Sequence, residues 1–118
     1  MSFDDDSFRA KVDDYQQRGA IAQVKAAQAY GRLLSLAENQ DSGQVRHVAR
    51  FLAATYNGAE FTFDLFDLRA LDVAISDDML ICLDALRWGK ADLCQLVPDG
   101  GNRMLAVIDQ WGLRPTET

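Results

Sequence analysis

The chain has 118 residues, of which 48% are hydrophobic and 25% charged, and its net charge is −6. This length accommodates one domain with one core, and the composition is typical of a globular protein rather than a disordered one. Because Lys and Arg are not clustered, we expect no direct binding to DNA or RNA. No apolar run approaches the roughly 18 residues that a membrane span requires, so we also expect no membrane segment.

The cysteines and the N-terminal residues indicate the compartment. Cys82 and Cys94 are the two cysteines, and the chain starts with neither a basic nor an apolar leader segment. We therefore expect a cytoplasmic protein in which both thiols are reduced. The prolines are confined to Pro98 and Pro115, so most of the chain lacks the strongest helix breaker, which favours an all-α fold.

The first forty residues carry a heptad pattern. Apolar or small residues recur at alternating intervals of four and three, with a cation every seven residues beside them. The seam consists of Phe8, Val12, Tyr15, Gly19, Ala22, Ala26, Ala29, Leu33 and Leu36, and the cations are Lys11, Arg18, Lys25 and Arg32. One helix from about Ser7 to Glu38 would be roughly 48 Å long, more than the width of a small domain. We therefore predict that this helix pairs with a second copy, giving a homo-oligomer, most simply a dimer.

Gly19 is the point at which this long helix would break most readily. Gly inside a helix costs about 1 kcal/mol relative to Ala. The alternative is a short helix followed by a second helix from Ala20 to Glu38. We favour the continuous helix because the seam runs through Gly19 without interruption.

The rest of the chain predicts a compact all-α bundle. We expect residues 1–118 to form one domain, in which the long helix of residues 1–40 packs with four or five shorter helices between residues 42 and 113. Little or no strand is expected. Residues 114–118 are a polar tail that we expect to be mobile.

Capping residues give the expected boundaries of the first shorter helices. Ser42 is a candidate N-cap, and Asn57-Gly58 is a helix C-terminal signal because Gly accepts the left-handed conformation there. Asp64 can cap a short helix that begins at Leu65.

The later helices have similar signals. Ser76 is the expected N-cap of the next helix, with Asp77 and Asp78 in its first turn. A short helical segment from Ala91 to Val97 follows, and Asn102 is expected to cap the last helix. Trp88 and Trp111 each stand beside a glycine at a helix end, where we expect them to close the core.

The stretch from Phe61 to Asp72 combines aromatic residues with negative charge. It holds three of the six phenylalanines within six residues, between two segments with helical apolar spacing. Residues 59–88 contain seven acidic and two basic residues, a net charge of −5. We therefore expect this stretch to be the centre of the core.

Several short motifs support a family resemblance. They are Arg50-Phe51-Leu52, Tyr56-Asn57-Gly58, the stretch from Phe63 to Asp72, and Gly100-Gly101 followed by Trp111-Gly112. Through them, residues 45–113 resemble a family of short, uncharacterised bacterial proteins that plasmids and integrative elements often encode. The family has no known activity, cofactor or site, so the resemblance implies a bacterial accessory protein. The first forty residues lie outside it.

The sequence does not indicate an active site, a metal site or a cofactor. His47 is the only histidine, and we interpret it as facing solvent or a partner. The two cysteines lack the spacing of zinc ligands, so we interpret both cysteines as packing residues. The carboxylate pairs Asp64 with Asp67 and Asp77 with Asp78 occupy expected helix starts, where negative charge is favourable without a substrate. A pocket containing both His47 and a cysteine would revive the enzyme hypothesis.

Two functional hypotheses remain from the sequence. The first is a non-enzymatic interaction or accessory module that self-associates through its first helix and presents an acidic surface, including Asp77, Asp78 and Asp84, to an unknown protein partner. The alternative is an acidic inhibitor that mimics nucleic acid and occupies the site of a DNA- or RNA-handling protein. A helix-turn-helix regulator is disfavoured because Arg87 is the only base in its would-be recognition helix.

Overall fold

The computed structural model describes residues 3–89 and 91–115, with side chains from residue 6 onward. Its four α-helices are α1 (Phe3–Asn39), α2 (Gly43–Tyr56), α3 (Val73–Leu86) and α4 (Gly100–Gln110), and its two 3-10 helices are η1 (Leu65–Ala70) and η2 (Leu93–Leu96). The described residues contain no strand, so the predicted all-α fold with a long first helix is confirmed. None of these helices is both long and apolar enough to cross a membrane.

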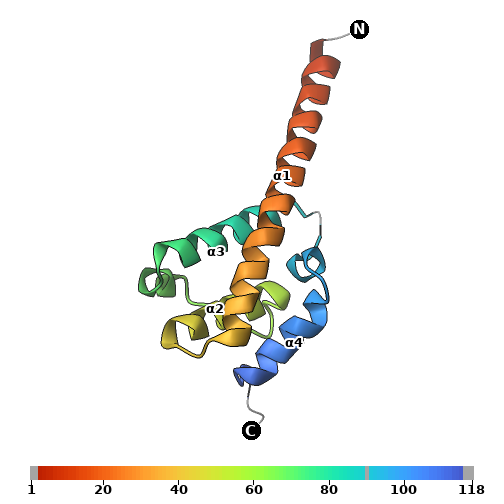
Figure 1. Cartoon of the computed structure of the whole chain (residues 1–118). Helices are drawn as coiled ribbons and strands as arrows, with labels where there is room; N and C mark the ends of the chain where they lie inside the picture. Colours follow the sequence, from red (N-terminus) through yellow and green to blue (C-terminus); the bar gives the residue numbers. More distant parts are fainter. Residues whose placement is uncertain (1–2, 90, 116–118) are drawn as a thin grey trace.

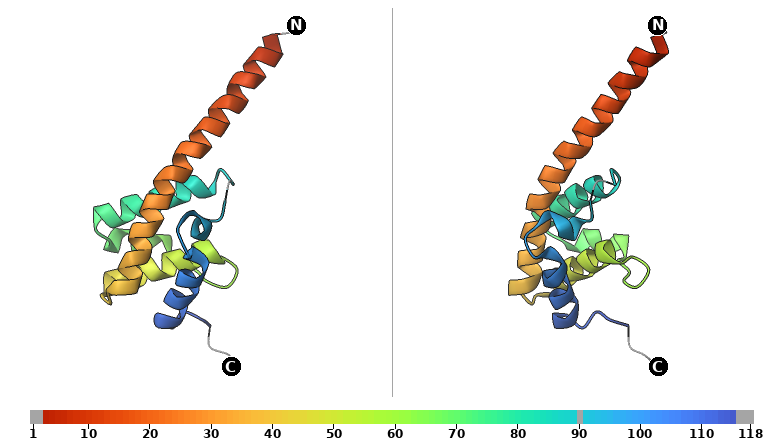
Figure 2. Two further views of the ribbon diagram at one scale, coloured as in Figure 1. Left: turned by 45° about the vertical axis from the view of Figure 1, so that its right-hand side comes forward. Right: turned by 90° about the vertical axis from the view of Figure 1, so that its right-hand side faces the viewer.

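Helix α1 is the axis of the molecule (Figure 1). It is continuous through Gly19, so the predicted continuous helix is confirmed and the alternative break does not occur. Its C-terminal half lies in the body, between α3 on one side and η2 with α4 on the other, whereas its N-terminal half projects as a single helix (Figure 2). We call residues 3–18 the arm and the remainder the body. The arm lies along the longest dimension of a molecule that measures 62 × 32 × 28 Å.

The core forms between the C-terminal half of α1 and the helices that follow it. Its α1 residues recur every three or four positions, as expected for one face of a helix. They are Ala22, Ala26, Ala29, Tyr30, Leu33, Leu34 and Ala37. Opposite them lie Val45, Val48, Ala49, Phe51, Leu52 and Ala53 of α2, Met79, Cys82 and Ala85 of α3, and Met104, Val107 and Ile108 of α4. Burying Leu33 or Leu34 completely contributes about 1.5–3 kcal/mol each.

Three predicted boundaries are confirmed by their capping hydrogen bonds. The Ser42 hydroxyl accepts from the Val45 amide at 3.3 Å, at the start of α2. Asn57 is the C-cap of α2, and its amide donates to the Ala53 carbonyl at 2.9 Å, but Gly58 does not adopt the expected left-handed conformation. The Asp64 carboxylate accepts from the Phe66 amide at 2.9 Å, at the start of η1. Each of these signals involves residues at most four positions apart, so the local sequence is sufficient to encode it.

The predicted start of α3 is wrong. The helix begins at Val73 with Asp72 as its N-cap, and Ser76 instead donates to the Val73 carbonyl at 3.0 Å. Asp77 and Asp78 therefore lie inside the helix rather than in its first turn. A tertiary contact accounts for this start. The Gln44 side chain of α2 accepts a hydrogen bond from the Asp72 amide and donates one to the Asp72 carboxylate.

The predicted start of α4 is also wrong. The helix begins at Gly100, and its N-cap is Asp99 in the left-handed conformation, with φ of 55°. Asn102 lies inside the helix, and its side-chain amide donates to the Asp99 carboxylate at 2.8 Å. The predicted segment from Ala91 to Val97 is present as η2.

The expectation that Phe61 to Asp72 forms the centre of the core is wrong. Phe61 and Leu71 are buried near its ends, but η1 between them has no buried residue. Leu65 and Phe66 are each 69% exposed. The physical reason is that the α1 seam, together with α2 and α4, fills the space that these side chains were expected to occupy.

Candidate functional site

The predicted self-association residues fall into two groups. Ala22, Ala26, Ala29 and Leu33 are buried in the body, and Leu36 is half-buried. Phe8, Val12 and Tyr15 belong to the arm, where Phe8 is 67% and Tyr15 50% exposed and Val12 is half-buried. The body thus uses the second half of the seam for its own core, and only the arm presents its seam outward.

The cations beside the seam also fall into two groups, those that are exposed and one that is held in an ion pair with α3. Lys11 and Lys25 are exposed. Arg32 forms a bidentate ion pair with Asp78 of α3, at 3.0 Å from Nε and 2.8 Å from Nη2, and this contact raises the pKa of Arg32. Arg32 is therefore part of the contact between α1 and α3 and is not available to a partner in the way that Lys11 is.

Trp88 fixes the point at which the arm leaves the body. Its ring packs edge-on against Tyr15, with 4.8 Å between the ring centroids, and its carbonyl accepts from the Tyr15 hydroxyl at 3.2 Å. The guanidinium groups of Arg18 and Arg87 lie 5.1 and 4.8 Å from the centre of the Trp88 ring. At the other end of the body, Trp111 donates from Nε1 to the Ala37 carbonyl at 2.9 Å. Both tryptophans therefore pack at the ends of the core.

The predicted acidic surface is partly neutralised within the chain. Asp78 is held by Arg32, and Asp84 accepts from Arg87 at 2.7 Å. Asp77 is exposed and has no ion pair among the described residues. Of the three predicted surface aspartates, Asp77 is therefore the one whose charge is not neutralised by an ion pair among the described residues.

His47 and the cysteines lie in different surroundings. The Nδ1 atom of His47 is 3.3 Å from the Asp67 carboxylate, within ion-pair distance but without hydrogen-bond geometry. Burial raises the pKa of the Cys82 thiol to about 12 and also raises that of Cys94, so neither thiol is activated as a nucleophile. Cys94 lines a small cavity of about 50 Å³ with Tyr30 and Asp92, and His47 is not part of its lining.

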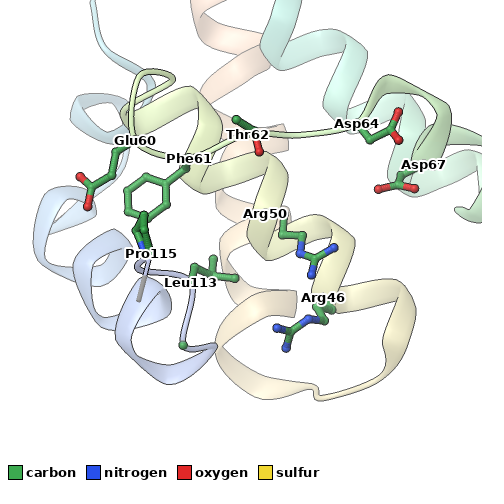
Figure 3. A pocket seen from close by; sticks show the side chains of 10 residues that line it. Arg46, Arg50, Glu60, Phe61, Thr62, Asp64, Asp67, Leu113 and Pro115 are labelled. Carbon is green, nitrogen blue, oxygen red and sulfur yellow. The ribbon is translucent and has the colours of Figure 1, made fainter. Parts of the chain in front are cut away.

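A cleft of about 460 Å³ lies between α2, the segment from Glu60 to Asp67, and the chain after α4 (Figure 3). Arg46 and Arg50 point into it from α2, and neither takes part in an ion pair within the described ranges. Its carboxylates already have local contacts: Glu60 with Asn57, Asp64 with the Phe66 amide and Asp67 with His47. Within residues 3–89 and 91–115, no cluster of three or more His, Cys, Asp or Glu side chains is arranged to hold a metal.

A family model described as "Family of unknown function (DUF7673)" matches residues 27–112. The chain belongs to this family. The matched region begins inside α1, after the arm, and covers most of the body. It also begins 18 residues before the resemblance detected from the motifs, which started at residue 45. No curated protein and no solved structure matches the chain.

One feature of the DUF7673 region was missed from the sequence. Leu65 and Phe66 are adjacent, apolar and exposed, although the apolar pattern around them suggested burial. The signal that could have found them is length, since the capped segment from Asp64 to Leu71 holds only two turns of 3-10 helix. So short an element has little surface with which to bury every apolar side chain.

Proposed function

We propose that this member of the DUF7673 family is a non-enzymatic interaction module that self-associates through its arm. The observation that carries the proposal is the arm seam, in which Phe8 and Tyr15 are exposed and Val12 is half-buried, on a helix that projects from the body. Helical stability in proteins comes mostly from the packing of an amphipathic face, whereas residues 6–11 of the arm are all exposed. A partner that covers the seam both removes apolar surface from water and stabilises the helix.

The same proposal includes the origin and the compartment of the protein. We propose that it is a bacterial accessory protein, carried on a mobile element, that acts in the cytoplasm without a cofactor. The family resemblance supports this origin. Buried or half-buried thiols with raised pKa values, as at Cys82 and Cys94, support a packing role for the two cysteines.

The alternative, an acidic inhibitor that mimics nucleic acid, ranks second. The net charge of −5 on residues 59–88 supports it. The ion pairs of Asp78 with Arg32 and of Asp84 with Arg87 weigh against it, because they neutralise two of the three predicted contact residues. Binding to a nucleic-acid-handling protein that weakens with salt and with Asp77→Asn would favour this alternative.

The test of self-association uses substitutions on the arm and leaves the chain at full length. A chain starting at Gln40 would lack the buried Tyr30, Leu33 and Leu34, so loss of association could simply reflect unfolding. The informative variant is Phe8→Glu with Val12→Glu, which places charge on the seam with residues that favour helix. Its matched control is Ala10→Glu, because Ala10 is exposed and lies off the seam.

The measurement is molar mass by light scattering and sedimentation over a range of protein concentrations. We expect the wild-type chain and Ala10→Glu to associate and the Phe8→Glu, Val12→Glu chain to be monomeric with unchanged far-ultraviolet circular dichroism. A wild-type chain that stays monomeric at the highest concentrations would contradict the proposal.

A further inference from the structure

An apolar groove of about 380 Å³ opens between α2, the segment from Gly58 to Leu68 and the C-terminal half of α3. Two threonines are the only polar residues among its described lining. Phe51 and Phe61 are its buried members, and Leu65 and Leu86 are its exposed large apolar side chains. The groove therefore has a buried apolar floor that is continuous with exposed apolar surface.

Phe66 extends this apolar surface beyond the groove. It is adjacent to Leu65 and equally exposed, and its ring is covered on one face by the Arg69 guanidinium at 4.9 Å. Neighbouring large apolar side chains that stay exposed beside a groove are typical of a surface that binds another protein. The groove and Leu65 with Phe66 together form what we call the apolar face.

The arm has the anchors that such a groove accepts. Phe8, Val12 and Tyr15 stand at positions i, i+4 and i+7, the spacing with which an amphipathic helix docks into an apolar groove. The arm points away from its own body on a continuous helix, so it cannot fold back onto its own apolar face (Figure 2). An arm on this face must come from a second copy.

Charge favours the apolar face over a second arm as the partner. The arm seam is flanked by the exposed cations Arg9 and Lys11, whereas the stretch of residues 59–88 that supplies much of the apolar face has a net charge of −5. Asp64 directly precedes Leu65 and Asp67 directly follows Phe66 in the sequence. The seam and the face are thus both apolar, and the charges that flank them are opposite in sign, although residues 3–18 as a whole contain five carboxylates and three cations.

Pairing of two arms is less favourable in either direction. In an antiparallel pair, Lys11 and Arg18 of one arm would face the same row of cations on the other. In a parallel pair, the second helix would meet Trp88, which packs on Tyr15, and the covered seam at Gly19 and beyond. Neither obstacle applies to an arm in the groove.

We propose that the arm of one copy docks onto the apolar face of a second copy, with Phe8 and Val12 in the groove and Arg9 and Lys11 near Asp64 and Asp67. This contact is heterologous, because two different surfaces meet. It rests on the proposed function, in that the arm mediates self-association, and it adds the surface that receives the arm.

The test is a complementation experiment with two full-length variants. The arm variant carries Phe8→Glu and Val12→Glu, and the face variant carries Leu65→Lys and Phe66→Lys at positions that are 69% exposed. The matched control for the face is Val73→Lys, because Val73 is also exposed and apolar but does not line the groove. Circular dichroism and thermal unfolding establish that each variant is folded.

We expect each variant alone to sediment as a monomer and their equimolar mixture to form a 1:1 complex, because one supplies an intact face and the other an intact arm. Val73→Lys should associate as the wild type does, and Lys11→Glu should weaken association about tenfold at low salt. A face variant that still associates alone, or a mixture of folded variants that stays monomeric, would overturn the arm-to-face contact while leaving association through the arm intact. A monomeric wild-type chain would overturn both proposals.

Discussion

Gly100 has no room for a side chain at its Cα atom. A Cβ atom there would overlap the Cys94 carbonyl oxygen and lie 2.8 Å from Val97 Cγ2. The backbone of η2 and the start of α4 meet at this point, so no side chain fits between them. The next residue, Gly101, has nothing within 4 Å of the corresponding position. Two adjacent glycines therefore have different structural roles.

We predict that Gly100→Ala lowers the free energy of unfolding by about 1–3 kcal/mol, because α4 must move away from η2. Gly101→Ala, the matched control, should be neutral or stabilise the chain by up to about 1 kcal/mol, since Ala favours helix. Urea unfolding of both variants checks this. Equal stability of the two variants would contradict the overlap at Gly100.

At the scale of elements, an ion pair joins the end of α1 to α4. Arg103 donates to the Glu38 carboxylate from Nε at 2.9 Å and from Nη2 at 2.7 Å, and both side chains are partly buried. The hydrogen bonds from Arg103 lower the pKa of Glu38 below its ordinary value of 4.5. The carboxylate is therefore more stable in the folded chain than in the unfolded one.

The lowered pKa determines how this contact depends on pH. Its contribution to stability is complete at neutral pH and is lost as the pH falls below 4.5 toward the folded-state pKa. We predict that Glu38→Gln is about 1 kcal/mol less stable than the wild type at neutral pH and that the difference decreases as the pH falls below the ordinary Glu pKa of 4.5. Urea unfolding across this range measures the effect.

Asp109→Asn provides the comparison for this prediction. Asp109 pairs with Arg114 at 3.0 Å, but both side chains are more than half exposed. Solvent screening leaves so exposed a pair with little effect on stability. If Asp109→Asn costs as much as Glu38→Gln, partial burial is not what strengthens the contact between α1 and α4.

At the scale of the whole molecule, the arm and the body differ in their contribution to stability. From Asp6 to Asp13 no side chain of the arm is buried, whereas the α1 residues of the body fill the core. The same heptad pattern therefore has two environments along one helix. The first is largely exposed to solvent and the second is the centre of the fold.

We predict that removing residues 1–13 changes the free energy of unfolding by no more than about 0.5 kcal/mol, because no core contact is lost. Leu33→Ala, on the same seam, should cost about 2–5 kcal/mol through the cavity it leaves. Chemical unfolding at concentrations where each chain is monomeric measures both. A large loss of stability in the shortened chain would show that the arm supports the body.

Much of the fold could be predicted from the sequence because its signals are local. The heptad spacing specified a long first helix, and Ser42, Asn57 and Asp64 marked boundaries through bonds to residues nearby in the chain. The starts of α3 and α4 could not be predicted in this way. The start of α3 depends on Gln44, 28 residues away, and α4 begins where its backbone meets η2.

The candidate site was predicted only in part. The seam correctly identified Phe8 and Tyr15 as residues of one helix face, but the same pattern continued through Ala22 to Leu33, which the body buries. The exposure of Leu65 and Phe66 was not predicted at all. The sequence of a short segment does not show whether an apolar side chain in it is buried or exposed to solvent.

The sequence by itself determined that the chain is helical, where α2 and η1 begin and which face of the first helix is apolar, because periodicity and capping act over one or two turns. Only the tertiary structure decided what covers each apolar face. Hydrophobic burial has no direction and depends on the space that remains when all elements pack together. That packing covers the seam from Ala22 to Leu33 and leaves the arm and the apolar face at the surface.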